Sequence, residues 1–279
     1  MISQAEKGRI FAALHEEPGA FVIPNAWDAG SARLLQNLGF PAIATTSAGF
    51  AFTIGKPDGT GAVTGKEHLE NARQIAQATS LPVSADLEGG FGDAPEDCAR
   101  TILLAAEAGV VGGSIEDWTG RNDDPIYDFD TAVARVAAAA QAARSLPFTF
   151  TLTARAENFL CDRPNLADTI MRLQAFQDAG ADVLYAPGLT RPDDIETVVK
   201  EVDKPVNVVM GLGVVKLTVE DLTQLGVKRI SVGSAFTRAA LGAFLTAARE
   251  VQTKGTFSFT EQATPHGELN AIFAAWPKT

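Results

Sequence analysis

The chain has 279 residues, 46% of them hydrophobic, and a formal net charge of −11, which suits one large α/β domain or two small ones and argues against binding to nucleic acid or anionic membranes. Its two cysteines, Cys98 and Cys161, form no CxxC or Cys/His cluster, so neither a disulfide framework nor a zinc site is expected. The first residues lack a basic segment followed by an apolar run, and no apolar run reaches the length of a membrane span, so a cytoplasmic protein is expected.

An amphipathic helix is predicted over residues 4–16, and a strand–helix pattern repeats after it. The predicted strands cover residues 21–24, 41–45, 82–86, 110–116, 148–155, 182–186, 205–210 and 228–232. A helix follows each strand, ending near Gly39 in the first unit and then covering residues 64–79, 95–108, 129–145, 165–179, 192–200, 219–225 and 235–253. A long loop that carries Gly55, Pro57 and Asp58 separates the second strand from its helix.

The predicted strands are continuous apolar runs, as expected for a parallel sheet that is buried on both faces. Eight strand–helix units in about 250 residues predict a closed (β/α)₈ barrel of the TIM type. A doubly wound open sheet is the structural alternative, although no GxGxxG follows the first strand. The barrel would occupy residues 1–255. Residues 256–279 would form a helical extension that packs on the barrel or on a neighbouring subunit, with apolar residues Leu269, Ile272, Phe273 and Trp276.

The third predicted strand ends in the sequence Asp86-Leu87-Glu88-Gly89-Gly90-Phe91-Gly92. Because strand side chains alternate, Asp86 and Glu88 would point to the same side and repel one another. A divalent cation with oxygen ligands, such as Mg²⁺, would relieve that repulsion. The alternative is an acidic turn that caps the next helix, which is predicted to start near Pro95.

Active sites in (β/α)₈ barrels form at the carboxyl ends of the strands. Polar residues that would lie there include Thr45, Thr46, Ser47, Asp58, Asp86, Glu88, Glu116, Arg155, Tyr185, Asn207 and Ser231. Four acids around one cavity would repel one another in the absence of a cation. The planar guanidinium of Arg155 suits either an ion pair with one of these acids or a bond to a substrate carboxylate. His15, His68 and His266 fall outside the strand ends and are assigned no chemistry.

Four short motifs follow one another in the chain: Thr45-Thr46-Ser47 with Asp58 beyond it, Asp86 to Gly92, Ile115-Glu116-Asp117, and Ala154-Arg155-Ala156-Glu157. In this order and spacing, the region from Phe21 to about Gly242 resembles the isocitrate lyase and phosphoenolpyruvate mutase superfamily. The resemblance implies a modified (β/α)₈ barrel that binds Mg²⁺ or Mn²⁺. It also implies the making or breaking of a C–C or P–C bond next to a 2-oxo acid through an enolate.

The same resemblance implies a role for each matching residue. Asp86 would be the direct metal ligand, and Glu88, Glu116 and the more distant Asp58 would reach the metal through water, since Mg²⁺ keeps several waters in proteins. The substrate would be held by Thr45, Thr46, Ser47, Asp86 and Arg155. Many members of the superfamily are tetramers that swap their last helices, so a homo-oligomer, a dimer or a tetramer, is expected.

The chain also departs from the lyase pattern. Its loop from Trp118 to Pro125 contains neither the cysteine nor the histidine of the lyases' Lys-Arg/Lys-Cys-Gly-His loop. Ala186-Pro187 replaces their Pro-Glu, and Val209 or Met210 replaces an asparagine. These differences argue against isocitrate or methylisocitrate as the substrate. They also leave open the proton donor, for which Arg121, Tyr185 and a metal-bound water are the candidates.

The leading hypothesis is a Mg²⁺-dependent lyase that cleaves a C–C bond, or decarboxylates, next to a small 2-oxo acid. One alternative is a P–C mutase or hydrolase that acts on phosphonopyruvate or phosphoenolpyruvate. It is disfavoured because Arg121 is the one cationic residue in the loop from Trp118 to Pro125. A second alternative is a non-catalytic barrel that binds an oxo acid.

Overall fold

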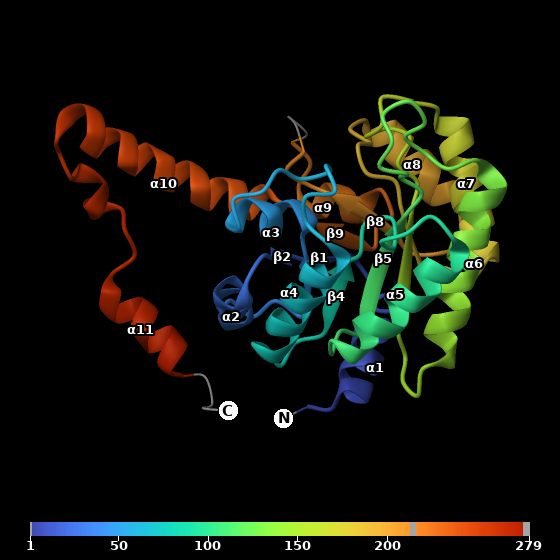
Figure 1. The fold of residues 1–279 in the computed structure, drawn as a ribbon, viewed down its shortest axis with the longest axis horizontal. Helices are drawn as coiled ribbons and strands as arrows, with labels where there is room; N and C mark the ends of the chain where they lie inside the picture. The colour runs from blue at the N-terminus through green and yellow to red at the C-terminus, as the bar shows by residue number, and fades with distance from the viewer. Residues whose placement is uncertain (1, 213–215, 276–279) are drawn as a thin grey trace.

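The strands form a single parallel sheet that closes into a barrel (Figure 1). The computed structural model describes residues 2–212 and 216–275. The strands in these residues are β1 (Phe21–Ile23), β2 (Asn25–Ala26), β3 (Ile43–Thr45), β4 (Val83–Asp86), β5 (Gly112–Glu116), β6 (Thr151–Arg155), β7 (Val183–Tyr185), β8 (Val206–Val209) and β9 (Arg229–Ser231). Each lies within a predicted strand or, for β2, directly after one.

Pro24 explains why the first barrel strand is divided into β1 and β2. A proline has no N–H to donate, so the ladder is interrupted at this position. β1 pairs with β9, and β2 pairs with β3. The two short strands therefore act as one staggered barrel strand, which joins the last strand to the second. The predicted (β/α)₈ barrel is confirmed, and the open doubly wound sheet is wrong.

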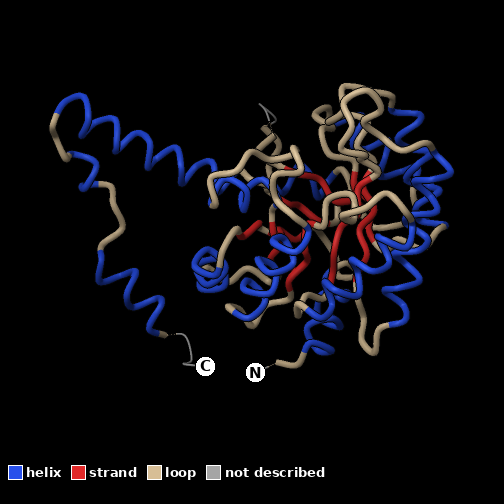
Figure 2. The backbone as a smooth tube through the Cα atoms, viewed as in Figure 1, coloured by secondary structure: helices blue, strands red, loops and turns tan. Residues whose placement is uncertain are grey.

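Helices surround the sheet in the order expected for strand–helix units (Figure 2). The described helices are α1 (Gln4–Leu14), α2 (Ala29–Asn37), α3 (Ser47–Thr53), α4 (Gly65–Gln77), α5 (Pro95–Glu107), α6 (Phe129–Ser145), α7 (Leu166–Asp178), α8 (Pro192–Glu201), α9 (Val219–Gln224), α10 (Ala235–Lys254), the 3₁₀ turn η1 (Ser258–Glu261) and α11 (His266–Ala274). The sequence predicts a loop where the structure has α3, so this helix is a correction to the prediction. Thr46 caps this helix, because its hydroxyl accepts from the Gly49 N–H at 3.2 Å.

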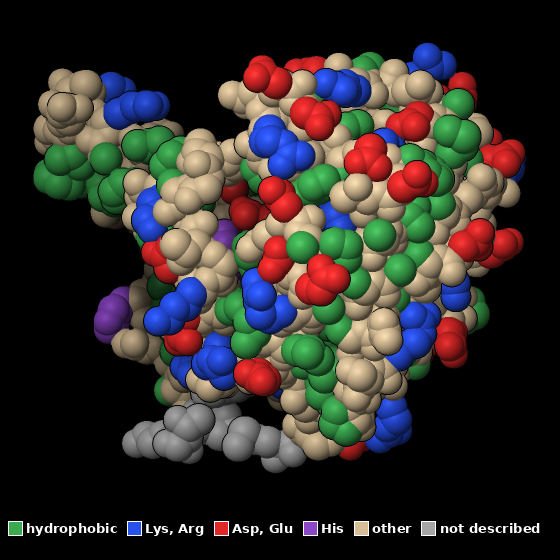
Figure 3. Space-filling view, turned by 45° about the vertical axis from the view of Figure 1, so that its right-hand side comes forward, with side chains coloured by type: hydrophobic (Ala, Val, Ile, Leu, Met, Phe, Trp, Pro, Cys, Tyr) green, Lys and Arg blue, Asp and Glu red, His purple; other side chains and the backbone are tan. Residues whose placement is uncertain are grey.

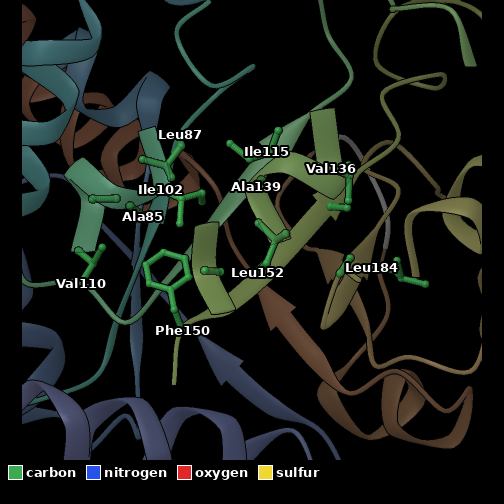
Figure 4. Packing of buried hydrophobic residues seen from close by; sticks show 14 of the residues in the cluster. Ala85, Leu87, Ile102, Val110, Ile115, Val136, Ala139, Phe150, Leu152 and Leu184 are labelled. Atoms are coloured by element: carbon green, nitrogen blue, oxygen red, sulfur yellow. The ribbon is translucent and has the colours of Figure 1, made fainter. Parts of the chain in front are cut away.

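The main hydrophobic core lies between the strands and the surrounding helices (Figure 4). Ile115 and Leu152 point outward from β5 and β6, toward side chains such as Val136 and Ala139 of α6. Because strand side chains alternate, the neighbours of these residues point into the barrel. Glu116 and Arg155 are such inward residues, and they lie side by side in the register of β5 and β6. The outer core thus determines which side chains face the interior.

A second, smaller cluster closes the amino-terminal end of the barrel. Phe11 of α1 packs with Ile23, Ala42 and Val111 and is fully buried. A Cβ at Gly112 would lie 2.7 Å from the Phe11 ring, so the close approach of α1 requires glycine there. With this end sealed, the opposite end of the barrel is left for a site.

The last helices leave the barrel instead of completing its outer ring (Figure 2). Thr237 is the one residue of α10 that is buried, and hydrophobic side chains gather on the projecting segment (Figure 3). After η1 the chain turns back, and α11 contacts α2. The predicted tail helix is present as α11, whereas Trp276 lies outside the described residues. The boundary at residue 255 and the exchange of helices between subunits stay predictions. No helix in the described part of the chain combines the length and apolarity needed to span a membrane.

Candidate active site

A cavity of about 330 Å³ opens at the carboxyl ends of the strands. It brings together most of the residues that the sequence assigned to a site: Thr45, Thr46, Ser47, Asp58, Asp86, Glu88, Glu116, Arg155 and Tyr185. Glu157, Asn207, Arg229 and Ser231 also line it. Arg121, the remaining predicted catalytic residue, does not line the cavity, although Trp118 of the same loop does.

Arg155 lies at the centre of the acidic residues. Its Nη1 is 2.7 Å from Glu116 Oε1 and 3.3 Å from Asp86 Oδ1, and its Nε donates to Glu157 Oε1 at 2.8 Å. The guanidinium also lies over the Tyr185 ring, 4.9 Å from its centroid. Of the two roles that the sequence left open for Arg155, the structure shows the ion pair, with three carboxylates at once.

The carboxylates nevertheless carry more negative charge than Arg155 balances. Burial raises the pKa of Glu116 well above its ordinary value; Arg155 opposes this, and Glu157, Asp86 and Glu88 add to it. At the cavity mouth, partial burial and then the charges of Asp86 and Glu88 raise the pKa of Asp58 to about 6. An added cation would relieve both effects.

Two loops are tied together beside Asp86. Its Oδ2 accepts from the Ser47 N–H at 3.0 Å, and its own N–H donates to Thr45 Oγ1 at 2.8 Å. The start of α3 is therefore held against the end of β4. This places the Thr45–Ser47 segment at the cavity wall, next to the predicted metal ligand.

Glu88 has a partner that the sequence analysis set aside. Its Oε1 lies 3.4 Å from Nε2 of His68, a buried residue of α4. The imidazole is stacked on Phe91, with ring centroids 5.4 Å apart, and meets the edge of Phe50. Burial lowers the pKa of His68, but the adjacent carboxylate of Glu88 and the charges of Asp86 and Asp58 more than offset this, so the net pKa is raised. A histidine on the buried face of an amphipathic helix was the signal that could have found it.

The loop that carries Glu88 is held by Arg135, which the sequence analysis also missed. Glu88, Gly90 and Phe91 have positive φ angles of 47°, 79° and 55°. Such angles are unusual for residues other than glycine. Arg135, on α6, is 1% exposed. It donates to the Gly92 carbonyl at 2.8 Å and to the carbonyls of Gly89 and Asp93.

The loop after β5 forms a small closed turn. Trp118 pairs with Ile126 in an isolated antiparallel bridge, and the Thr119 N–H donates to the Pro125 carbonyl at 2.9 Å. Arg121 faces Asp93 at 3.3 Å and lies over the Tyr127 ring. These contacts hold Arg121 on the outer side of the loop.

The donor set suits a hard cation that keeps its water. Within residues 2–212 and 216–275, no group of three or more His, Cys, Asp or Glu side chains is arranged to ligate a metal directly. The acids that line the cavity offer carboxylate oxygens, and Mg²⁺ typically uses one or two carboxylates and several waters. Asp58, Asp86, Glu88 and Glu116 therefore fit a cation that is held largely through water.

Comparison with known proteins places the chain among its relatives. Residues 11–252 match the family model described as phosphoenolpyruvate phosphomutase. An uncharacterized protein of Mycobacterium tuberculosis (strain H37Rv) is 34% identical over 267 residues, 94% of this chain and 95% of that protein. The 2-methylisocitrate lyase of Salmonella typhimurium is 32% identical over 190 residues, which cover 66% of this chain and 63% of that enzyme.

Solved structures agree with these matches. A protein of Burkholderia cenocepacia J2315 with a provisional lyase/mutase name has a TM-score of 0.95 and is 59% identical, with 98% of this chain and 97% of that chain covered. Oxaloacetate acetylhydrolase, solved with its product oxalate, has a TM-score of 0.87 and is 25% identical, covering 99% of this chain and 96% of its own. The sequence motifs, the barrel and these matches together show that the chain belongs to the phosphoenolpyruvate phosphomutase family, within the isocitrate lyase and phosphoenolpyruvate mutase superfamily.

Proposed function

We propose that this protein is a Mg²⁺- or Mn²⁺-dependent lyase that cleaves a carbon–carbon bond, or decarboxylates, next to the 2-oxo group of a small acid. The observation that carries the proposal is that Asp58, Asp86, Glu88 and Glu116 all line one cavity, in which Arg155 pairs with Asp86 and Glu116. Membership of a superfamily of lyases and mutases supports an enzyme. The relative solved with oxalate supports a small oxo acid as the substrate class.

Asp86 would hold the metal ion directly, and Glu88, Glu116 and Asp58 would hold it through water. When bound, such an ion polarises the 2-oxo group and neutralises the charge that develops as the bond breaks. Arg155 would stay protonated among its carboxylates and orient the substrate from the opposite side. The hydroxyls and amides of Thr45, Thr46 and Ser47 would hold the substrate carboxylate.

Of the two side chains that the sequence offers as proton donors, Tyr185 and Arg121, Tyr185 is the better placed. Its pKa is raised, first by burial, so the phenol keeps its proton at neutral pH. It lines the cavity, whereas Arg121 pairs with Asp93. We therefore assign proton donation to Tyr185 and no direct role to Arg121.

Phosphonate chemistry is a weaker candidate. A phosphonyl group needs cations beyond those that hold the oxo acid, and the loop from Trp118 to Pro125 offers Arg121 alone, on its outer side. The loop also lacks the lyases' cysteine and histidine, so methylisocitrate is not proposed as the substrate. A barrel that binds an oxo acid without turning it over is the remaining alternative.

Parallel assays with Mg²⁺ would test the proposal. Oxaloacetate, alkylmalates and phosphonopyruvate are supplied side by side, and release of pyruvate, carbon dioxide and phosphate is measured. Asp86→Asn removes the charge of the proposed direct ligand, and Asp193→Asn, an exposed change on α8, is the matched control. Carbon–carbon cleavage that D86N abolishes and D193N retains is expected. Phosphate from phosphonopyruvate alone would contradict the proposal, and oxalate binding without turnover would favour the non-catalytic barrel.

We also propose that the protein is a homo-oligomer in the cytoplasm. Apolar side chains on α10 support an interface between subunits, since Leu241, Phe244 and Leu245 are 37%, 66% and 46% exposed. The helix extends from the barrel with little of its own surface covered. A neighbouring barrel would cover this face.

A further inference from the structure

Arg229 is a second arginine inside the barrel, and the proposed mechanism does not use it. It is the first residue of β9, and it is 5% exposed. Its Nε donates to Asn207 Oδ1 and its Nη2 to Thr153 Oγ1, both at 2.9 Å. Its Nη1 is buried and has no hydrogen-bond partner in the described residues.

The charge of Arg229 is also unbalanced. No Asp or Glu of the described residues lies within 4 Å of it, whereas Arg155 has three carboxylates at that distance. Burial and the nearby charge of Arg155 lower its pKa and the Tyr185 phenol opposes this, leaving a value of about 10, so it stays a cation at neutral pH. An unpaired cation in a barrel interior is costly unless an anion joins it.

Arg229 lies in the same cavity as the acidic residues. Tyr185, Asn207, Ser231 and Arg229 line it together with Asp86 and Glu116. Barrel interiors are normally filled by Val, Ile and Leu side chains. Here Ser84, Ser114 and Thr153 take such positions instead. The barrel interior beneath the candidate metal site is therefore polar, and it contains the positively charged Arg229.

We infer that Arg229, with Asn207 and Ser231 beside it, binds a second carboxylate of the substrate, which makes the substrate a 2-oxo dicarboxylic acid. This inference rests on the proposed function, in which the 2-oxo end of the substrate lies near Asp86 and Arg155. A carboxylate accepts two hydrogen bonds from the fork of a guanidinium, and Nη1 is the donor left free for it. A monoacid leaves that donor unpaired, so the site discriminates against it.

Calorimetry on the full chain with Mg²⁺ tests this inference with matched ligands. The two pairs are 2-oxoglutarate with 2-oxopentanoate and oxaloacetate with 2-oxobutyrate, each measured in competition with oxalate. Within a pair the chain length is the same, and a methyl group replaces the distal carboxylate. Oxalate reports on the metal end alone. At least one diacid is expected to bind the wild type about 10- to 100-fold more tightly than its monoacid.

Arg229→Met is expected to remove this preference and to leave oxalate binding unchanged, while Arg229→Lys retains part of it. Should R229M fail to fold, Asn207→Asp gives the second test. It places a carboxylate beside Nε, so that Arg229 forms an ion pair within the protein and its charge is no longer available to the ligand. Equal binding of diacid and monoacid by the wild type, or a preference that survives R229M or N207D, would overturn the inference. A wild type that does not bind oxalate with Mg²⁺ would contradict the proposed function itself.

Discussion

Replacing Arg135 by methionine removes the cation that holds the Glu88–Asp93 loop against α6. Three backbone carbonyls, those of Gly89, Gly92 and Asp93, lose a charged donor. Asp93 is exposed, so water can replace the donor there, while Gly89 and Gly92 are half-buried. Each buried group left unpaired costs about 1–3 kcal/mol. Because water reaches the two glycine carbonyls in part, we expect their loss of a partner to lower the free energy of unfolding by about 2–4 kcal/mol. Contact of the guanidinium with the Tyr127 ring, 4.2 Å from its centroid, adds to this.

The change should also weaken metal binding. Residues held at positive φ carry strain of about 1–3 kcal/mol each and persist only where their surroundings hold them. Without Arg135, Glu88 and Phe91 can relax, and Glu88 moves away from its position beside the cavity. We expect an affinity for Mg²⁺ about tenfold lower than that of the wild type, which corresponds to about 1.4 kcal/mol.

Urea unfolding followed by circular dichroism, with Mg²⁺ calorimetry on the same preparations, measures both effects. Arg144→Met is the matched control: it lies on the same helix, is exposed and donates to a single carbonyl, that of Gly180, at 3.0 Å. We expect Arg144→Met to lower the free energy of unfolding by less than about 0.5 kcal/mol. An unfolding midpoint of R135M equal to that of R144M would refute the reasoning about stability. A destabilised R135M with unchanged Mg²⁺ affinity would refute the role of Arg135 in positioning Glu88.

Three further predictions follow from the site and from the projecting helix. Since the folded-state pKa of Asp58 is about 6, above its ordinary 3.8, the folded apoprotein binds this proton more tightly than the unfolded chain, and the contribution of Asp58 to stability declines as pH rises from about 4 to about 6. Mg²⁺ competes with the same proton, so calorimetry should show that the affinity for Mg²⁺ rises through about pH 6 and that binding releases protons. If the affinity of Asp58→Asn for Mg²⁺ depends on pH in the same way, this prediction is wrong. Mg²⁺ at 100 times its Kd should raise the free energy of unfolding by about 2.7 kcal/mol, a gain that EDTA or Asp86→Asn removes in thermal melts; an equal gain in D86N would mean that Asp86 is not a ligand. Phe244→Asp places a charge on a side chain that is 66% exposed, so light scattering should show a smaller assembly if α10 lies in an interface, and an unchanged mass with unchanged stability would show that it does not.

Much of the barrel could be predicted because its signals are local. The sequence predicts a helix over residues 129–145, and α6 covers Phe129–Ser145. The bounds of most other elements could be predicted to within a few residues, because glycine follows the helices and apolar runs mark the strands. α3 was missed because a seven-residue segment with an internal glycine has little helical preference of its own. It forms where Thr46 caps it and where Asp86 holds Ser47.

The convergence of the acids could likewise be predicted, because the ends of parallel strands meet on one rim. The partners of those acids could not. His68 and Arg135 lie on helices, and which face of a helix meets which loop depends on packing across the whole unit. Arg135 lies 46 residues from Gly89 in the chain, and nothing local relates the two. Arg229 was likewise unassigned, since a strand pattern does not reveal that its neighbours inside the barrel include no acid.

The sequence by itself determined the alternation of strands and helices, the order of the motifs and the set of carboxylates at one end of the barrel, because periodicity and turn residues act over a few positions. The tertiary structure alone decided that Arg155 bonds to three of those carboxylates, that Pro24 splits a strand to close the sheet, and that α10 leaves the barrel. The physical reason is strand register. The register of β5 and β6 places Glu116 beside Arg155, 39 residues further along the chain. That register depends on how the outward side chains of both strands pack against the helices.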